Sequence, residues 1–111
     1  MVTTLITAYK LWVEYRELFP KETKYTLGEK IDELLIESME SALTATFLPK
    51  EQKRPFVHKA IVKLDTGKVL LQIAWEIKSI DTKKYIALST PLNEAGRMFG
   101  GWHNQLLKSL E

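Results

Sequence analysis

Residues 27–45 read LGEKIDELLIESMESALTA, and this stretch decides the fold class. At about 100° per residue, its apolar and small side chains fall on one face of a helix. These residues are Leu27, Ile31, Leu34, Leu35, Ser38, Ala42 and Ala45. The opposite face carries Glu29, Glu33, Glu37 and Glu40. The stretch therefore predicts a two-faced helix, whose acidic side either faces water or meets a basic surface on a neighbouring subunit.

The same helix-type spacing continues through the rest of the chain. Four prolines and five glycines are its main breaks. We expect four helices, at residues 3–18, 26–47, 50–79 and 82–109. Thr26 with Glu29 forms a capping box at the start of the second helix, and Asp81 is the expected cap of the fourth. Short connections between such helices predict an all-α, antiparallel (up-down-up-down) four-helix bundle, with residues 1–111 as a single domain.

Length and composition limit the classes of protein that fit. One hydrophobic core fits in 111 residues, and 45% hydrophobic with 27% charged residues is typical of a globular chain. The absence of cysteine excludes disulfides, thiolate catalysis and Cys-based zinc sites. The start of the chain lacks the pattern of a signal peptide, and no run of about 18 apolar residues occurs. We therefore expect a cytoplasmic protein that does not span a membrane.

The first and third expected helices are apolar on more than one side. The first has a core stripe that includes Leu5 and Trp12, with further apolar side chains on its far side. In the third, apolar residues wrap most of the circumference between residues 69 and 77. A helix that is apolar nearly all round is covered on several sides, so we predict that a second subunit covers these surfaces. The expected interface residues are Leu11, Tyr15, Leu18, Leu70, Ile73, Trp75 and Ile77.

Because of glycines and a proline, the sequence does not decide whether the last two helices are continuous. Residues 65–67 mark either a break or a change of apolar face in a continuous helix. We favour the continuous helix, because an interior Gly costs only about 1 kcal/mol relative to Ala. In the last segment Pro91 predicts a kink. That segment is either a helix with Gly100 and Gly101 at an oligomer interface, or a turn near the C-terminus. As a helix it has a core stripe of Leu88, Leu92, Ala95, Phe99, Trp102, Leu106 and Leu110.

Charge is divided unevenly along the chain. The total is small, since 16 Lys and Arg against 14 Asp and Glu give a net charge of +2. Residues 1–49 carry five basic and eight acidic side chains (net −3), whereas residues 50–111 carry eleven and six (net +5). Symmetric assembly would repeat the basic half around an axis, and the combined surface would bind phosphate backbones in a salt-dependent way. The alternative is that these basic side chains are simply solvated. The candidate nucleic-acid contacts are Lys53, Arg54, Lys59, Lys63, Lys68, Lys83, Lys84 and Arg97. Trp75 is either a base-stacking or an interface side chain.

Catalytic and metal-binding patterns are missing from the sequence. Neither histidine has the Glu-x-x-His spacing of a carboxylate-bridged metal site, because Pro55 stands three residues before His58 and Gly100 three before His103. Two histidines without cysteine do not predict a zinc site, and no serine lies in a nucleophile-elbow context. We therefore predict no catalytic residue, no metal ligand, no cofactor and no enzymatic activity.

Two strings resemble the signatures of a known family. Residues 19–31 read FPKETKYTLGEKI, and residues 93–102 read NEAGRMFGGW. They resemble the first-loop and fourth-helix signatures of the accessory variability determinant family, the four-helix-bundle accessory proteins of diversity-generating retroelements. Residues 83–85 and 88–89 also match, so the resemblance covers nearly the whole chain. The proteins encoded in 23S rRNA intervening sequences are similar and more distantly related.

The resemblance implies a homopentamer whose basic surface binds RNA or DNA and a reverse transcriptase, without catalysis of its own. Arg97 and the pair Gly100-Gly101 match the fourth-helix signature directly, and Lys68 falls where members often have Arg. We therefore expect a non-enzymatic adaptor between reverse transcriptase and nucleic acid. The alternative is a self-assembling four-helix-bundle module of the 23S rRNA intervening-sequence type, with no direct role in nucleic-acid binding.

Overall fold

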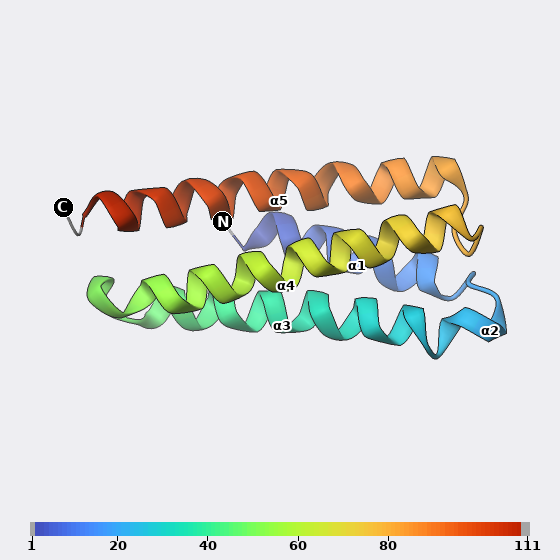
Figure 1. Ribbon diagram of the computed structural model, residues 1–111, viewed down its shortest axis with the longest axis horizontal. Coiled ribbons are helices and arrows are strands. Elements are labelled where there is room, and N and C mark those ends of the chain that lie inside the picture. The colour runs from blue at the N-terminus through green and yellow to red at the C-terminus, as the bar shows by residue number, and fades with distance from the viewer. Residues whose placement is uncertain (1, 110–111) are drawn as a thin grey trace.

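The computed structural model describes residues 2–109, where the chain is helical almost throughout (Figure 1). Its elements are α1 (Thr3–Arg16), α2 (Lys21–Lys24), α3 (Leu27–Phe47), α4 (Lys50–Glu76) and α5 (Thr82–Lys108). No strand occurs within residues 2–109, so the all-α prediction is confirmed. Leu110, which we expected in the core stripe of the last helix, lies outside the described residues.

The four long helices pack side by side as a helical bundle. α3 packs on α4, α4 on α5 and α5 on α1, while α1 also contacts α3. The connection from α3 to α4 lies at one end of the molecule, and the connections that lead into α3 and α5 lie at the other end (Figure 1). The bundle is elongated, with extents of 48 × 21 × 19 Å.

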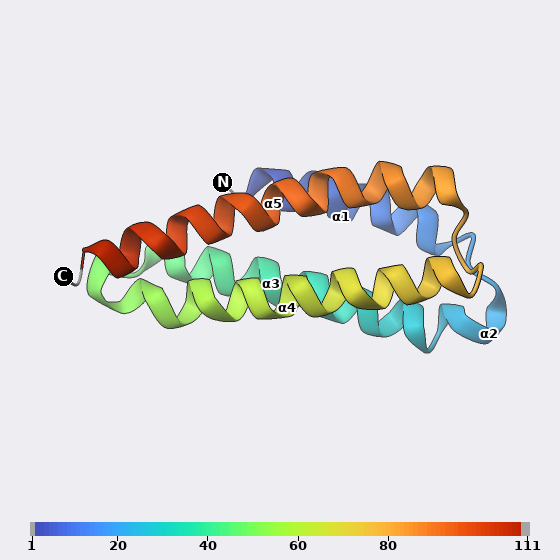
Figure 2. The same cartoon turned by 45° about the horizontal axis from the view of Figure 1, so that its top comes forward.

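α1 is much shorter than α4 and α5. It has 14 residues, whereas α4 and α5 have 27 each, which corresponds to about 21 Å against about 40 Å at about 1.5 Å per residue. Figure 2 shows α1 beside the part of the bundle that holds the α4–α5 connection. The opposite end contains only the last turns of α3, the first turns of α4 and the last turns of α5. This region, residues 43–47, 50–58 and 102–109, is called the three-helix end below.

Two buried clusters hold the helices together. The larger one draws buried side chains from all four long helices and includes Trp12, whose ring meets that of Phe19 edge-on with the centroids 5.4 Å apart. The smaller one lies at the three-helix end and consists of Ala45, Val57 and Leu106, with Ile61 and Trp102 packed against it. The core at this end is small because α1 does not reach it.

Both helices whose continuity was open are continuous. α4 runs unbroken through residues 65–67, as we favoured. Gly67 is buried there against α3, and a Cβ atom at this position would lie 3.5 Å from Leu35 Cδ2. α5 likewise continues through Pro91 and its three glycines, so the alternative of a turn near the C-terminus is excluded.

Three expected helix limits are corrected by one to three residues. α1 ends at Arg16 rather than residue 18, because Leu18 N and Phe19 N each donate to a carbonyl three residues back, both at 3.0 Å. α4 ends at Glu76 rather than residue 79, and α5 at Lys108 rather than residue 109. After α1 and α4, backbone hydrogen bonds leave the regular helical pattern, whereas the one-residue difference at α5 is within the usual uncertainty of a helix boundary.

The end of α4 is fixed by a residue with an unusual backbone conformation. Lys78 has φ of 67°, in the left-handed region. Lys78 N donates to Trp75 O at 3.0 Å, and Ser79 N donates to Ala74 O at 2.8 Å. This pair of bonds is a Schellman motif, which satisfies the last carbonyls of the helix.

The two expected helix caps have different outcomes. Thr26 is the N-cap residue of α3, which begins at Leu27, so the position of the cap is as expected. The hydrogen bond of the capping box is absent, since Thr26 Oγ1 accepts none from α3 and instead donates to Glu22 O at 3.3 Å. The short helix α2, which the sequence did not predict, lies just before α3 and supplies that acceptor. The cap at Asp81 is confirmed, since its Oδ1 accepts from Lys84 N at 2.8 Å.

Candidate nucleic-acid interface

Half of the eight candidate basic residues are engaged within the chain. Three form ion pairs, which are Lys63–Glu37 (3.0 Å), Lys68–Asp65 (3.5 Å) and Lys84–Asp81 (2.7 Å). Lys53 instead donates to the carbonyl oxygens of Ala45 and Thr46, at 2.8 and 3.2 Å, and so caps the C-terminus of α3. A phosphate group would have to compete with these partners.

The two shortest ion pairs shift the pKa values of their members. The hydrogen bond from Lys63 lowers the pKa of Glu37. Hydrogen bonds from the side chain and the backbone N–H of Lys84 lower the pKa of Asp81, and the same carboxylate raises the pKa of Lys84. Each shift favours the charged form of the group concerned, although such solvent-exposed pairs add little to stability.

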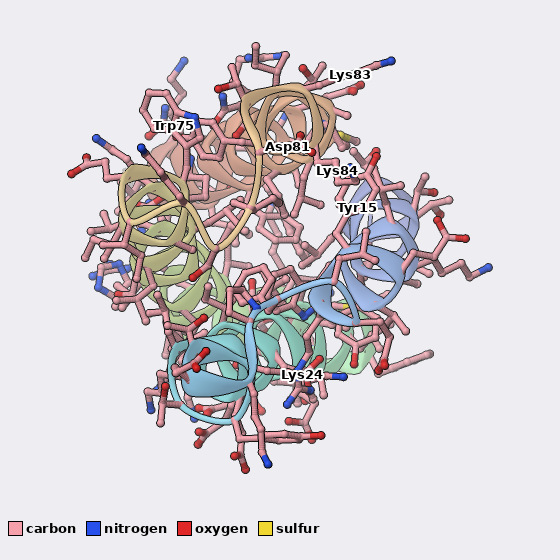
Figure 3. The ribbon with its side chains drawn as sticks, turned by 90° about the vertical axis from the view of Figure 1, so that its right-hand side faces the viewer. Tyr15, Lys24, Trp75, Asp81, Lys83 and Lys84 are labelled. Atoms are coloured by element: carbon pink, nitrogen blue, oxygen red, sulfur yellow. The ribbon has the colours of Figure 1, made fainter. Side chains whose placement is uncertain are left out.

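The other four candidates are exposed and form no ion pair with another described residue. They are Arg54, Lys59, Lys83 and Arg97. Arg54 and Lys59 lie in the first half of α4, whereas Lys83 lies in the first turn of α5, at the opposite end of the bundle. Figure 3 shows Lys83 pointing away from the bundle and Lys84 pointing toward Tyr15 of α1. One chain therefore does not gather the eight candidates into one patch.

A basic region that we did not predict lies at the three-helix end. A cleft of about 530 Å³ is lined by Lys50, Lys53, Trp102, Gln105, Leu106, Lys108 and Ser109. A second cleft of about 450 Å³ is lined by Glu51, Arg54, Pro55, His58 and His103. Glu51 is the one carboxylate among these lining residues, against four Lys and Arg side chains. Taken together the two clefts are basic: the first has three lysines and no carboxylate among its lining residues, whereas in the second Arg54 is balanced by Glu51.

Sequence reasoning missed Lys50, Trp102 and Lys108 as members of a site. Lys50 is the first residue of α4 and Lys108 the last residue of α5, so only the packing of α4 on α5 brings them to one cleft. The available signal was their position at the start of one helix and the end of the next, because antiparallel neighbours place such positions side by side.

One face of the Trp75 ring is covered by another aromatic ring of the same chain. Its ring stacks on that of Tyr85, with the centroids 4.9 Å apart and an interplanar angle of 6°. Its Nε1 donates to Thr82 Oγ1 at 3.0 Å. Figure 3 shows the side chain at the end of the bundle that holds the α4–α5 connection. Trp75 therefore ties α4 to α5 within its own chain, and its expected role at an interface or in base stacking stays a prediction for its remaining surface.

The expected oligomer-interface residues fall into two groups. Leu18, Ile73 and Ile77 expose 63%, 41% and 54% of their surface, as a contact with a second subunit requires. Gly101 is exposed and Gly100 is half-buried, and nothing lies within 4 Å of a Cβ atom built at either position. The remaining four, Leu11, Tyr15, Leu70 and Trp75, pack against the larger core cluster. These four are half-buried in their own bundle, so their expected role at an interface stays a prediction for the part of their surface that remains open.

α4 exposes an apolar stripe that the sequence revealed only in part. Val62, Val69, Ile73 and Ile77 expose between 41% and 56% of their surface. Their spacing of seven, four and four residues places them on one side of the helix. We missed Val62 and Val69 because periodicity alone does not tell which of two apolar faces meets the core. This set is called the α4 stripe below.

The acidic face of α3 is partly neutralised within the chain. Glu37 meets Lys63 of α4 at 3.0 Å, and Glu33 meets Lys30 at 3.6 Å. Glu29 and Glu40 are exposed. The apolar residues Ile36 and Leu43 lie beside them and expose 37% and 41% of their surface. Both readings of the acidic face therefore stay open, since two of its four carboxylates have partners in the same chain.

The described residues contain no group of three or more His, Asp or Glu side chains arranged to hold a metal ion. His58 and His103 lie close together across α4 and α5, with their ring centroids 5.6 Å apart. Within residues 2–109, no helix combines the length and the apolar character needed to cross a membrane. Comparisons with known protein families and with curated proteins found no match to this chain.

Proposed function

We propose that this chain is a non-enzymatic adaptor that self-associates and binds nucleic acid, either RNA or DNA. The observation that carries the proposal is the charge at the three-helix end. There Lys50, Lys53, Arg54 and Lys108 line two clefts together with a single carboxylate, Glu51. Cationic surfaces of this kind contact phosphate oxygens and bind with little dependence on base sequence.

The resemblance of residues 19–31 and 93–102 to the accessory variability determinant family supports a more specific role. In that role the chain forms a homopentamer of antiparallel up-down-up-down bundles and links a reverse transcriptase to its RNA or DNA in the cytoplasm. The helix connections, which alternate between the two ends of the bundle, support this topology. The α4 stripe supports self-association, because an exposed apolar surface of this kind marks an interaction site.

Of the eight candidate nucleic-acid contacts, the exposed members contribute most to the proposed site. Arg54 lies directly at the basic clefts, and Lys59 lies about one turn further along α4. In a ring, Lys83 and Arg97 of one subunit add to the basic surfaces of the others. The four engaged lysines bind phosphate only when they exchange their present partners.

A second candidate function is a self-assembling module with no role in nucleic-acid binding. The engagement of Lys53, Lys63, Lys68 and Lys84 within the chain favours it. It also accounts for the α4 stripe, because that stripe needs only a second subunit to cover it.

Salt-dependent binding of labelled RNA distinguishes the two functions. The adaptor releases counterions when it binds, so its affinity falls steeply between about 50 and 200 mM salt. The measurement is fluorescence anisotropy of a labelled oligonucleotide over that range. Affinity that does not change with salt, or no binding at the lowest salt, contradicts the nucleic-acid role and leaves the self-assembling module.

A further inference from the structure

The larger cleft at the three-helix end combines an aromatic ring with basic side chains. Trp102 lines it from α5, next to Gln105 and Lys108, while Lys50 lines it from the first turn of α4. Among the described residues, α1 lies beside the other end of the bundle, and the cleft is lined by side chains of α4 and α5 together with Ser109. Its volume of about 530 Å³ is within the range of small-ligand sites.

Trp102 is the tryptophan that opens onto this basic cleft. Trp12 is fully buried in the larger core cluster, and one face of Trp75 is covered by Tyr85. Trp102 is half-buried and packs against both core clusters, so its ring is held in place while part of it lines the cleft. An aromatic ring held in this way is a platform on which an unpaired base can stack.

The charge around the ring matches a phosphate backbone. Lys50 and Lys108 are exposed at the cleft, whereas Lys53 also holds the C-terminal carbonyls of α3. The described residues that line this cleft include no carboxylate. A base on Trp102 would thus have cationic side chains beside it for the flanking phosphates.

We propose that this cleft binds single-stranded nucleic acid, with one unpaired base stacked on Trp102 and the flanking phosphates on Lys50 and Lys108. The inference rests on the proposed function, and it names the form of nucleic acid that this site selects. A duplex is not the ligand, because its bases are already stacked on both faces and cannot cover the tryptophan.

The first test separates base stacking from phosphate contact. The probes are a labelled single-stranded RNA of about 12 nucleotides, a duplex of the same sequence, and an abasic oligonucleotide of the same length. Trp102→Leu is expected to weaken binding of the single strand about 10-fold and to leave the abasic probe unchanged, since loss of one stacked base has about this effect. Trp102→Phe keeps an aromatic face and retains most of the affinity.

The second test concerns the phosphates. The double variant Lys50→Glu/Lys108→Glu is expected to reduce the salt slope of single-strand binding by about 1.4, or about 0.7 for each lost phosphate contact. The matched control is Lys10→Glu/Lys21→Glu, which makes the same change in charge at exposed positions on α1 and α2. The control is expected to change the slope by less than half as much.

A third measurement keeps the proposal testable if Trp102→Leu does not fold. In the Trp75→Phe variant, Trp12 is buried, so Trp102 is the tryptophan that a ligand can reach. The single strand is expected to quench its fluorescence, whereas the abasic probe is not.

The outcomes separate this inference from the proposed function. Binding of the duplex and the single strand with equal affinity, unchanged by the Trp102 and lysine variants, overturns the cleft as the site but leaves a nucleic-acid-binding adaptor. If none of the three probes binds, the proposed function fails as well.

Discussion

At the scale of single residues, Asp32 of α3 is the main polar link between α1 and α3. Its Oδ1 accepts hydrogen bonds from Tyr9 Oη at 2.8 Å and from Trp12 Nε1 at 3.1 Å, and Arg16 lies 3.6 Å from its Oδ2. Few other contacts join these two helices. Asp32 is therefore the polar anchor of α1 on α3, in addition to the apolar packing of α1 on α5.

Replacing Asp32 by Ala is expected to destabilise the chain by about 2–4 kcal/mol. The substitution leaves two partly buried donors without an acceptor and the Arg16 guanidinium without its counter-ion. Urea unfolding measures the change, and the control is Glu29→Ala, which removes an exposed carboxylate on the same helix. A loss no larger than that of the control would show that water replaces Asp32 as the acceptor.

Asp32 also affects the ionisation of Tyr9. Burial, followed by the hydrogen bond to Asp32, raises the pKa of Tyr9 to about 12. Because this pKa is raised in the folded chain, the resulting stabilisation is complete below the unfolded pKa of about 10 and is lost as the pH rises toward 12. Ultraviolet titration of tyrosinate should show one of the four tyrosines ionising late. The late step is expected to vanish in Tyr9→Phe, and a titration without any late step contradicts the prediction.

Lys78 offers a stabilising substitution. Its left-handed backbone, with φ of 67°, is disfavoured for side chains with a Cβ atom and easily adopted by glycine. Lys78→Gly is therefore expected to raise the free energy of unfolding by about 0.5–1 kcal/mol. The control Lys83→Gly, within the first turns of α5, is expected to lower it. If both glycine variants raise the free energy of unfolding, or if neither does, this explanation of the end of α4 is contradicted.

At the scale of elements, two glycines lower the helix propensity of α5, and packing within the described residues does not offset this loss. Gly100 and Gly101 lie inside the helix, where each costs about 0.5–1 kcal/mol relative to Ala. Apart from the adjoining residues and backbone of the helix itself, no atom of residues 2–109 lies within 4 Å of a Cβ built at either position. Close packing within the described chain therefore does not explain these glycines, and close approach by a second subunit would.

Gly100→Ala/Gly101→Ala is expected to have opposite effects on the chain and on its assembly. Each alanine should stabilise the helix by about 0.5–1 kcal/mol, whereas the added methyl groups should separate closely packed subunits. Thermal unfolding at low concentration and light scattering at high concentration measure the two effects. The control is Asn104→Ala, a nearby exposed position on α5. Unchanged assembly in the double variant removes the glycines from the interface.

At the scale of the whole molecule, the exposed apolar side chains lie on different sides of the bundle. The α4 stripe lies on one helix, whereas Ile36 and Leu43 lie on α3 and Val13 on α1. Surfaces that differ in this way and bind one another give head-to-tail contacts, which form a ring when the rotation between subunits closes and an open filament when it does not. The polarised charge of the chain fits such contacts, because the acidic residues concentrate in the first half of the sequence.

Ile73→Asp is expected to dissociate the assembly without unfolding the chain. Ile73 lies in the middle of the α4 stripe and exposes 41% of its surface, so a charge there is solvated in the monomer and buried without a partner in the oligomer. Light scattering measures the mass, and circular dichroism checks the helices. The control is Tyr25→Asp, since Tyr25 is 60% exposed outside the stripe. A wild-type chain that is monomeric at about micromolar concentration contradicts self-association through the stripe.

The sequence by itself determined the helices. The period of residues 27–45 and of the three comparable stretches predicts the all-α class and the helix limits to within three residues, because helical amphipathicity is a local property. It also identified Asp81 as a cap, since the acceptor and the donor are three residues apart. It missed α2, whose four residues are too few for a periodic pattern.

Only the tertiary structure decided how the side chains are used. It pairs Lys63 with Glu37, covers one face of Trp75 with Tyr85, and brings Lys50 of α4 to Lys108 and Trp102 of α5. Such contacts join residues on different helices and depend on their relative length and rotation, which no local period contains. The packing of α4 on α5 has the largest effect, because it forms the basic cleft at the three-helix end from residues far apart in the sequence.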